Sequence, residues 1–438
     1  MKILVISYFF APQNAIGAVR PTKLAKYLER MGHQVTVICG GGMDGMQDPT
    51  LARDMAAMRD VHVIQERNWL RWMKQRRGQP ATGKAGNQTA PKAADTRQSR
   101  VHKAGDAVYR WLRWRADASF RRRAIRECKG LSQTYDVVFS SYAPMSVHRA
   151  ACRAKRLGVA KRWIADYRDE VTVPFDWMKG KIPRFYQMVK ENADICCAVS
   201  QGFLEMMGRQ QDGRVLSNGY DREDLPERRT VRQPDGTLRV AYCGQVSEGR
   251  RHVADRDITP MFRALQSLAG QGLLHQEQIR LVYAGRESGL FRAQAESCGL
   301  GGCVEDHGLV SRQESIRLQQ GADILLMASW HMSSQKGIMT GKLFEYMMMD
   351  KPIICCMAGD LTGSPLARLL DQTGVGLCCE QAAGEGDRQK LRAYLQELLT
   401  RWKAGQSLLN AQNRAEEFAY PQLAAKLSGW MEILDQKE

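Results

Sequence analysis

Three glycine-containing segments place charged side chains directly after short apolar runs of the sequence. They are FFAPQNAIGAVRP with Gly17, YCGQVSEGRR with Gly244, Arg250 and Arg251, and SQKGIMTGK with Gly337. Glycine lets the backbone approach a ligand closely, and the free N–H groups at a helix start bind phosphate. We therefore interpret the three segments as candidate phosphate-binding loops. The P-loop lysine motif is absent from the sequence, which disfavours an ATP site of that type.

The third segment continues into TGKLFEYMMM and then into an apolar run. This order predicts a helix that begins at Thr340 or Gly341 and precedes a buried parallel strand. Lys342 and Glu345 fall in the first two turns of that helix. Glu345 can then face a ligand while Leu343 faces the core. The alternative is a solvated surface glutamate that the helix dipole stabilises.

The elements that must position these residues follow an alternating order of strands and helices. Strands are predicted at 2–10, 34–38, 61–64, 137–139, 162–166 and 195–199, and again at 238–243, 279–284, 324–327 and 352–356. A polar stretch at 221–236 separates the two series. We predict an α/β fold of two Rossmann-like, doubly wound domains that face a central cleft. Their predicted ranges are 1–222 and 238–415, with a linker at 223–237 and a final helix at 416–438 that packs on the first domain.

The charge of the chain is concentrated in one segment. The formal net charge is +17, and residues 66–129 carry 18 Lys and Arg against 5 Asp and Glu. The remainder is close to balanced, which argues against a nucleic-acid-binding fold throughout. Residues 66–129 interrupt the strand series as an insertion, and we expect its centre, residues 76–99, to be poorly ordered because it is rich in Gly, Ala, Pro, Thr and Gln.

Tryptophans are interleaved with arginines in this basic segment, at Trp69, Trp72, Trp111 and Trp114. Aromatic rings at headgroup level and cations on anionic lipid are typical of a membrane interface. We therefore expect contact with an anionic membrane surface. A solvated insertion and single-stranded nucleic acid binding are the alternatives.

The twelve cysteines include three adjacent pairs but no CxxC motif. We expect small buried hydrophobes in a reducing cytosol, and no metal site. No apolar run approaches the roughly 20 residues that span a bilayer, and we find no signal-peptide pattern. The expected location is therefore the cytoplasm, on the inner face of the cell membrane.

Taken in order, several segments resemble glycosyltransferases of the GT-B fold, in the large family-four group and its polysaccharide-biosynthesis type. The segments are MKILVISYFFAP…IGAVRPTKLAKYLERMGHQVTVI, DYRDE, ADICCAVSQGF…VLSNGYDREDL, RVAYCGQ, IRLVYAGR…EDHGLVSRQESIRLQQGADILLMAS and TGKLFEYMMMDKPII. The resemblance covers nearly the whole chain except the basic segment. It implies an acceptor-side first domain and a second domain that binds a nucleotide diphosphate sugar.

The resemblance also implies roles for particular residues. Glu345 would accept hydrogen bonds from the donor ribose, and Gly17 would lie near the diphosphate. Other donor-binding residues would be Gly244, Arg250, Arg251, Gly337, Thr340, Gly341 and Lys342. The catalytic residues would be Asp169, near the reacting centre, and Arg168, as its orienting or acceptor-binding neighbour. The alternative for this pair is a local contact that shapes a loop.

The sequence departs from the resembled family at two positions. Gly337 stands where many members have a glutamate, and Gln245 stands where many have an arginine, so Arg250, Arg251 or Arg256 would supply the phosphate-neutralising charge. The reaction expected is transfer of the sugar to a glycan or lipid-linked acceptor, with retention and without a metal or cofactor, in cell-surface polysaccharide or glycolipid synthesis. An epimerase of the same fold and a catalytically inactive scaffold remain alternatives.

Overall fold

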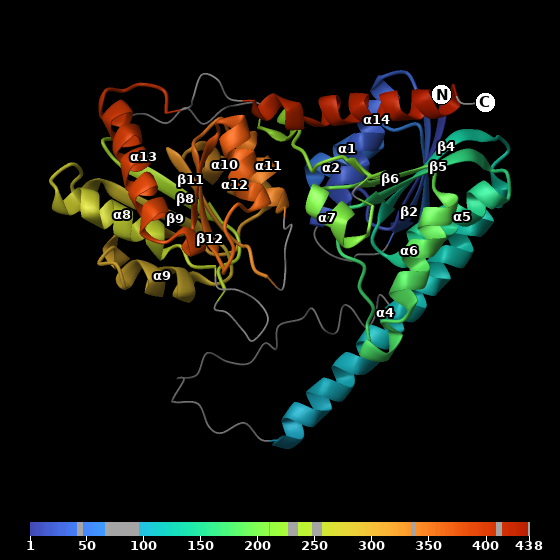
Figure 1. Cartoon of the computed structure of the whole chain (residues 1–438), viewed down its shortest axis with the longest axis horizontal. Helices are drawn as coiled ribbons and strands as arrows, with labels where there is room; N and C mark the ends of the chain where they lie inside the picture. Colours follow the sequence, from blue (N-terminus) through green and yellow to red (C-terminus); the bar gives the residue numbers. More distant parts are fainter. Residues whose placement is uncertain are drawn as a thin grey trace. The chain divides into compact units, whose positions relative to one another are not determined.

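The computed structural model describes residues 1–41, 47–65, 96–209, 211–226, 235–247, 256–333, 339–408 and 414–436, except for the side chains of 96–109 and 113. The chain divides into two compact units (Figure 1). The first comprises Met1–Val199, Phe203–Leu216 and Ala424–Glu438, and the second comprises Ser200–Gly202 and Ser217–Leu423. Each unit is built around one parallel sheet.

The sheet of the first unit has the strand order β3-β2-β1-β4-β5-β6-β7, with every pair parallel. The strands are β1 (Lys2–Ser7), β2 (Gln34–Gly41), β3 (Asp60–Gln65), β4 (Tyr135–Tyr142), β5 (Ala160–Tyr167), β6 (Ile195–Ala198) and β7 (Arg214–Val215). On β1, Ile3 pairs with Val35 of β2 and with Val137 of β4. The strand order therefore reverses at β1, and such switch points are where open α/β sheets bind ligands.

Helices pack on the sheet of the first unit, and β1, β4 and β5 are buried along most of their length. The helices are α1 (Ile16–Arg30), α2 (Pro49–Ala56), α4 (Thr96–Gly130), α5 (Met145–Arg156), α6 (Lys181–Asn192) and α7 (Gln201–Met206), and α14 (Tyr420–Asp435) enters this unit at Ala424. Ser428 of α14 lies 2.8 Å from Nε2 of His33. Helix α1 begins at Ile16, so Gly17 lies in its first turn rather than in the expected loop.

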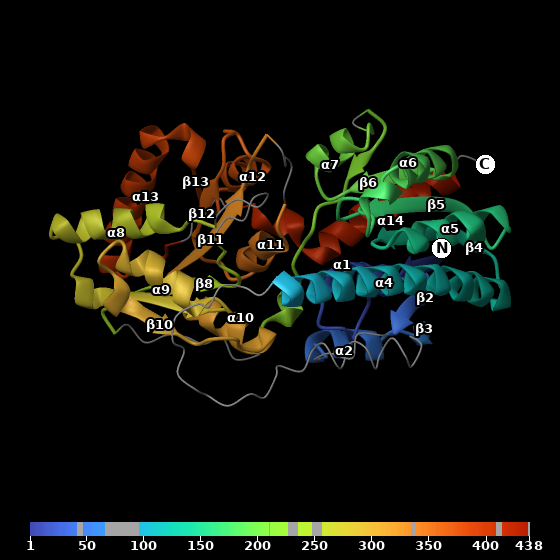
Figure 2. The same ribbon diagram turned by 90° about the horizontal axis from the view of Figure 1, so that it is seen from below.

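The second half of the basic segment forms a long helix of the first unit. Helix α4 packs against α5, as Figure 2 shows, and also contacts β2 and β3. Phe120, Ala124 and Cys128 recur at helical spacing and are buried in the core of the first unit. The end of this segment is therefore part of the core of the first unit, because its apolar stripe supplies buried residues. Residues 66–95 lie outside the described part of the chain.

The second unit repeats the architecture with the order β10-β9-β8-β11-β12-β13 and parallel pairing throughout. The strands are β8 (Leu238–Cys243), β9 (Ile279–Ala284), β10 (Val304–Asp306), β11 (Ile324–Trp330), β12 (Ile353–Ala358) and β13 (Gly376–Glu380). The order reverses at β8, which lies between β9 and β11. This places the switch point of the second sheet at the carboxyl ends of β8 and β11.

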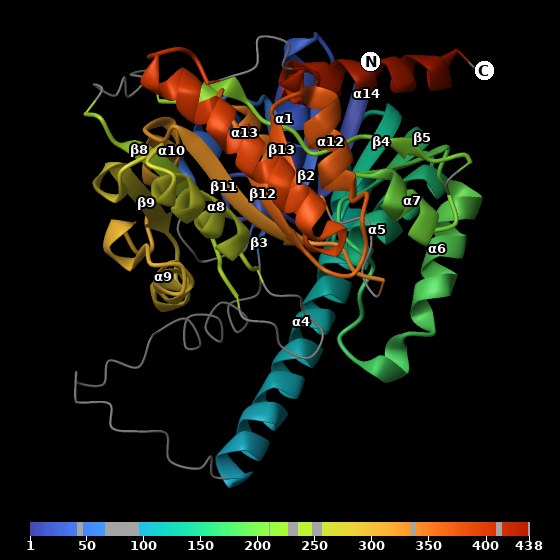
Figure 3. The same ribbon diagram turned by 60° about the vertical axis from the view of Figure 1, so that its left-hand side comes forward.

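Helices α8 and α13 pack together on this sheet (Figure 3). The helices of the unit are α8 (Thr259–Gly270), α9 (Ser288–Glu296), α10 (Arg312–Gln320), α11 (Gly341–Met347), α12 (Pro365–Thr373) and α13 (Glu385–Lys403). Met347, Met348 and Met349 are buried in the core, as the sequence predicted. All ten predicted strands are confirmed within a few residues at each end. The three that the sequence analysis missed, β7, β10 and β13, are short edge strands.

The cysteines behave as the sequence predicted, since all twelve are free thiols and eleven are buried, with Cys378 partly exposed. Within the described part of the chain, no helix combines the length and apolar character needed to cross a bilayer.

Candidate functional site

The switch point of the second sheet brings together Gly244, which follows β8, and Lys342, in the first turn of α11. Gly244 has a φ of 143°, and a Cβ on it would overlap Nζ of Lys342. A side chain is therefore excluded at this position both by the backbone conformation and by the lysine. Two residues that the sequence analysis assigned to one phosphate site, from segments far apart in the chain, are in direct contact.

The ammonium group of Lys342 lies over an aromatic ring, with Nζ 4.5 Å from the centroid of Tyr242. Burial disfavours its charge and, with a smaller contribution from Arg256, lowers the pKa of Lys342 to about 8. Thr340 caps α11 because its side chain accepts a hydrogen bond from the backbone N–H of Lys342 at 3.3 Å. An anion beside this ammonium group would restore the charge balance that burial removes.

Glu345 lies one turn further along α11 and keeps a quarter of its side chain exposed. Gln319 donates a hydrogen bond from Nε2 to Oε1 of Glu345 at 2.8 Å. Arg312 lies 3.6 Å from the other oxygen through Nε, and its Nη2 donates to Asp224 at 2.9 Å. These polar partners hold the carboxylate in one orientation. The sequence analysis missed them, because they come from other elements and have no fixed spacing to Glu345.

The helix that carries Lys342 and Glu345 is anchored by Tyr346. The hydroxyl of this buried tyrosine accepts from the backbone N–H of Cys243 at 3.1 Å and donates to the carbonyl of Leu326 at 3.2 Å. Helix α11 is thereby joined to the ends of β8 and β11. Leu343 is buried beside it, as the predicted division of faces required.

Arg256 lies beside the residue that follows Gly244. Its Nη1 donates to the carbonyl of Gln245 at 2.8 Å, and its guanidinium lies 5.4 Å from the ring centroid of Trp330. A cation thus stands beside the residue after Gly244, where the resembled family has arginine. The predicted donor-binding residues Arg250, Arg251 and Gly337 lie outside the described part of the chain.

In the first unit, Gly17 and Arg168 meet beside the carboxyl ends of β1 and β4. Arg168 donates from Nη1 to the carbonyl of Gly17, and a Cβ at position 17 would overlap its guanidinium. Nε of Arg168 donates to the carbonyl of Tyr142 at 2.6 Å, and the guanidinium lies 5.2 Å from the ring centroid of Phe9. Arg168 therefore links the loops that follow three different strands.

Asp169 points away from this buried network, with 67% of its side chain exposed. Its Oδ2 lies 3.6 Å from Nε of Arg168. An exposed carboxylate beside a fixed guanidinium can take part in chemistry or simply form a local ion pair. The catalytic assignment of Asp169 and Arg168 stays a prediction.

A second, fully buried ion pair supports the same loops. Arg20 donates from Nε and Nη2 to both oxygens of Asp166, at 3.0 and 2.7 Å. Ser141 donates to Oδ2 at 2.9 Å. Burial alone would raise the pKa of Asp166, but the charge and hydrogen bonds of Arg20, with those of Ser141 and Cys197, lower it below its usual value. This ion pair could not be predicted from the sequence, because Arg20 and Asp166 are 146 positions apart and no local motif links them.

His148 of α5 lies in the core of the first unit. It has no exposed surface, its ring packs against Tyr167 at a centroid distance of 4.6 Å, and its Nδ1 lies 2.9 Å from Oγ of Ser140. Burial lowers its pKa to about 3, so the ring is neutral at physiological pH. A group enclosed by aromatic side chains has no route to a substrate.

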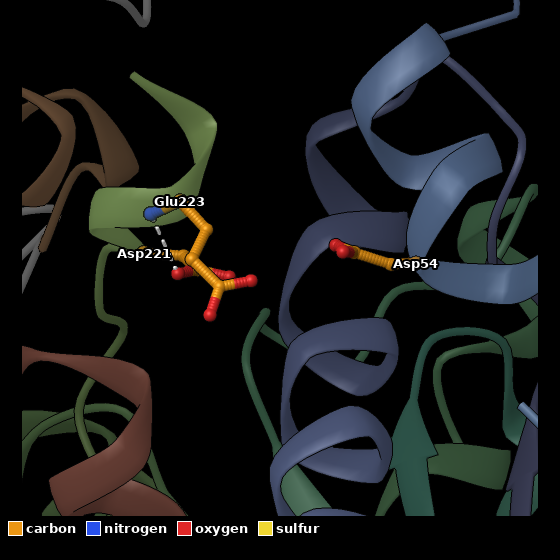
Figure 4. A group of neighbouring side chains, drawn as sticks. All are labelled: Asp54, Asp221 and Glu223. Carbon is orange, nitrogen blue, oxygen red and sulfur yellow. Dashed lines mark hydrogen bonds between the residues drawn. The ribbon is translucent and has the colours of Figure 1, made fainter. Parts of the chain in front are cut away.

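Asp54, Asp221 and Glu223 are drawn in Figure 4 as a group of carboxylates, and each takes part in contacts of its own unit. In the first unit, Nζ of Lys23 lies 2.6 Å and Nζ of Lys26 lies 3.0 Å from the carboxylate of Asp54 on α2. In the second, Asp221 caps the short 3₁₀ helix Arg222–Asp224 by accepting from the backbone N–H of Glu223 at 3.0 Å. The described contacts of Asp54 and Asp221 are therefore structural.

Of the four predicted membrane-contact tryptophans, Trp111 and Trp114 lie on α4, and Trp69 and Trp72 lie outside the described residues. Trp111 is 41% exposed. The structure adds Trp177, which the sequence analysis did not single out and which is 74% exposed. Nζ of Lys181 lies 4.8 Å from the ring centroid of Trp114 and 5.7 Å from that of Trp177. The helix and a distant loop therefore contribute to one aromatic and basic patch.

Comparison with solved structures finds the same two-unit architecture in proteins with little sequence similarity. No protein family model and no curated protein sequence matches the chain. Sucrose-phosphate synthase from Thermosynechococcus elongatus is similar with a TM-score of 0.58 and 13% identity, over 100% of both chains. The lipopolysaccharide outer core galactosyltransferase WaaB has a TM-score of 0.53 and 14% identity, over 99% of both chains.

A putative UDP-N-acetylglucosamine 2-epimerase from Listeria monocytogenes is also similar, with a TM-score of 0.55 and 12% identity, over 100% of this chain and 98% of the other. These likenesses and the two parallel sheets show that the chain has the GT-B fold, as predicted. At this level of identity they establish the fold alone, because one fold supports several reactions. The family-four assignment stays a prediction.

Proposed function

We propose that this protein is a glycosyltransferase that moves a sugar from a nucleotide diphosphate donor to a glycan or lipid-linked acceptor. The observation that carries the proposal is the convergence of Gly244, Lys342 and Glu345 at the switch point of the second sheet. A glycine that leaves room, a partly buried cation and an oriented carboxylate are the groups that a diphosphate and a ribose require. The solved structures with the same fold include glycosyltransferases, which supports the reaction class.

In the proposed reaction, the ammonium of Lys342 faces the diphosphate and neutralises charge as the nucleotide leaves. The carboxylate of Glu345, held by Gln319 and Arg312, accepts hydrogen bonds from the ribose hydroxyls. Fixed donors and cations at this position stabilise the leaving group without reorganisation. Transfer with retention, independence of metal and cofactor, and a role in cell-surface polysaccharide or glycolipid synthesis are further parts of the proposal.

Asp169 and Arg168 are the residues that we propose act at the acceptor side. Arg168 is held by the carbonyls of Gly17 and Tyr142, so it presents a fixed cation at the end of the first sheet. The aromatic and basic patch around Trp114 and Trp177 supports peripheral attachment to the inner face of the cell membrane. Attachment would bring the first unit to an acceptor in the bilayer.

A nucleotide-binding screen tests the donor site. Isothermal titration with UDP, GDP, ADP and CMP, and with their common sugar conjugates, should identify one nucleoside diphosphate that binds the wild-type protein. Glu345→Ala should lower the affinity for that nucleotide at least tenfold, since a hydrogen bond to a charged group contributes about 1.5–3 kcal/mol. Glu314→Ala, on exposed α10, is the matched control and should bind as wild type. Absence of binding by every nucleotide to folded protein would overturn the proposal.

Epimerisation of the sugar nucleotide is the second candidate, because a putative epimerase shares the fold. The two reactions differ in their need for an acceptor. Incubation of the preferred sugar nucleotide with enzyme alone, followed by product analysis, separates them. A changed sugar still attached to the nucleotide would establish the epimerase, and release of the nucleotide that depends on a membrane or glycan extract would establish the transferase.

A further inference from the structure

A cavity of about 380 Å³ lies at the switch point of the first sheet, and the donor assignment makes no use of it. It is lined by residues that directly follow β1 and β4, by the loop after β5, and by side chains of α4, α5 and α6. Ligands of open α/β sheets bind in this position, beyond the carboxyl ends of the strands. Its size falls in the range of sites for small organic molecules, about 300–1,000 Å³.

The walls of the cavity are mainly apolar. Phe9, Trp114 and Tyr142 contribute aromatic rings, and Val173 and Pro174 contribute aliphatic surface from the loop after β5. Binding of an apolar group against such a lining releases water from both surfaces, which favours binding. It offers few hydrogen-bonding partners for the many hydroxyls of a neutral glycan.

Three cations line the same cavity, namely Arg110, Arg149 and Lys181. Among the described residues, no carboxylate lies within ion-pair distance of the three, although Arg149 is attracted by the charge of Asp117 and Arg110 by that of Asp176. Aromatic rings hold them instead, with Arg110 5.5 Å from the centroid of Phe175 and Arg149 5.7 Å from that of Phe185. Side chains held in this way remain available to an anionic ligand.

The one carboxyl group of the lining is Asp117 on α4. Its Oδ1 is buried and has no hydrogen-bond partner within the described part of the chain. Burial raises the pKa of Asp117 to about 6, opposed in part by hydrogen bonding to Ser146 and by the charges of Arg149 and Arg121. The lining therefore keeps a positive net charge even when this carboxyl group is ionised.

The mouth of the cavity adjoins exposed aromatic surface. Trp177 stacks on Phe175 with a centroid distance of 5.9 Å, and Lys181 contacts both Trp177 and Trp114. A ligand whose apolar part continues out of the cavity would lie along these rings. On its inner side, the cavity is bounded by Phe9 and Tyr142, which are the two residues that also contact Arg168.

The geometry points to a binding site for an amphiphilic phosphate, in which a phosphate or diphosphate head meets Arg110, Arg149 and Lys181 and an attached hydrocarbon chain lies on the aromatic wall. This inference rests on the proposed function and deepens it, because it makes the acceptor a lipid-linked phosphate rather than a free glycan. A phosphate without a chain would leave the apolar wall unused, and an alcohol with the same chain would leave the cations unpaired.

Farnesyl phosphate, farnesol and inorganic phosphate are the probes that test the site, by isothermal titration to the full-length protein below the micellar concentration. Farnesyl phosphate should bind one molecule per chain, at least tenfold more tightly than farnesol or inorganic phosphate. Equal affinity for farnesyl phosphate and farnesol would overturn the inference, as would binding by inorganic phosphate alone.

Variants locate the binding. Arg110→Gln and Lys181→Gln should each lower the affinity for farnesyl phosphate about tenfold. Arg115→Gln is the matched control, because Arg115 lies on the same helix over the ring of Trp111 but does not line the cavity. Val173→Trp, which fills the cavity, should abolish binding. Unchanged affinity in both cation variants, in samples with wild-type thermal midpoints, would contradict the assignment.

Two further experiments distinguish a lipid phosphate site from membrane attachment and from failure of the proposed transferase function. Vesicles of phosphatidylserine test attachment to a bilayer surface, and loss of vesicle binding in Arg110→Gln with unchanged farnesyl phosphate binding would reassign the cations to the membrane. The nucleoside diphosphate that binds the second unit should bind Val173→Trp normally. Nucleotide binding without farnesyl phosphate binding would reject the lipid acceptor alone, and the reverse result would reject the proposed transferase while keeping this site.

Discussion

The Nζ atom of Lys342 occupies the space that a Cβ at position 244 would need. The glycine that follows β8 is therefore required by a lysine that belongs to another strand–helix junction. This contact makes the candidate donor site one physical unit rather than two loops with similar composition.

Gly244→Ala tests that unit directly. The added methyl group would displace Lys342 and would also sit in a backbone conformation with φ of 143° that favours glycine. We expect nucleotide affinity to fall at least tenfold and the thermal midpoint to fall by a few degrees. Gly289→Ala, in α9 with open space around it, is the control and should be neutral or slightly stabilising. Unchanged nucleotide binding in Gly244→Ala would show that the lysine contact is unimportant for the ligand.

The lowered pKa of Lys342 predicts a pH dependence of nucleotide affinity. Because its pKa is about 8 in the free protein, the ammonium loses its proton as the pH rises from 7 to 9.5. Affinity for the diphosphate should be nearly constant at first and then fall about tenfold per pH unit above 8. Titrations across this range check the prediction. Lys342→Met should bind weakly at every pH, and a wild-type affinity that stays flat to pH 9.5 would contradict the role of this lysine.

The same pKa shift has a consequence for stability. A lysine whose folded pKa lies below its unfolded value of about 10.4 destabilises the fold at neutral pH, where it must be charged. Lys342→Met should therefore raise the thermal midpoint at pH 7 while it removes nucleotide binding. The advantage of the variant should shrink as the pH rises through 8, because the wild-type side chain becomes neutral first in the folded state and is neutral in both states only above about 10.4. A lower midpoint at pH 7 would show that the lysine is structural.

The buried pair of Arg20 and Asp166 should be essential to the first unit. Asp166→Asn leaves a buried guanidinium without its charge partner, which typically costs about 3–5 kcal/mol in the free energy of unfolding. Because the folded pKa of Asp166 is lowered, this stabilisation is present above its unfolded value of about 3.9 and is lost as the pH falls through the folded value. Urea unfolding between pH 3 and 7 measures both effects. A cost below 1 kcal/mol at pH 7 would refute this expectation.

Asp169, two residues after the end of β5, should matter for turnover but not for stability. With 67% of its side chain exposed, Asp169→Ala should leave the thermal midpoint unchanged, since substitutions at such positions typically change stability by less than about 0.5 kcal/mol. If the carboxylate acts at the reacting centre, turnover should fall about 100-fold or more. Glu170→Ala, at the next exposed position, is the control and should keep wild-type turnover. Retained turnover in Asp169→Ala would remove this residue from the site.

Much of the architecture was determined by local sequence. Period, turn residues and apolar runs predicted ten strands and the start of α11 at Gly341, because each signal lies within a few residues of the element that it describes. The short edge strands β7, β10 and β13 were missed, because so few residues carry little pattern. The core role of Phe120, Ala124 and Cys128 at the end of the basic segment was not predicted, because the surrounding charge masked their apolar stripe.

Contacts between distant parts of the chain were decided only by the tertiary structure. The sequence placed Gly244 after a strand and Lys342 and Glu345 in the first turns of a helix, but only the parallel pairing of β8 with β11 brings Lys342 against Gly244. The pairing of Arg20 with Asp166 and the cavity beside Trp114 likewise depend on which strands are neighbours. Such contacts have no characteristic spacing in the chain, so the sequence by itself determined the residue types available for chemistry, and packing determined which of them meet.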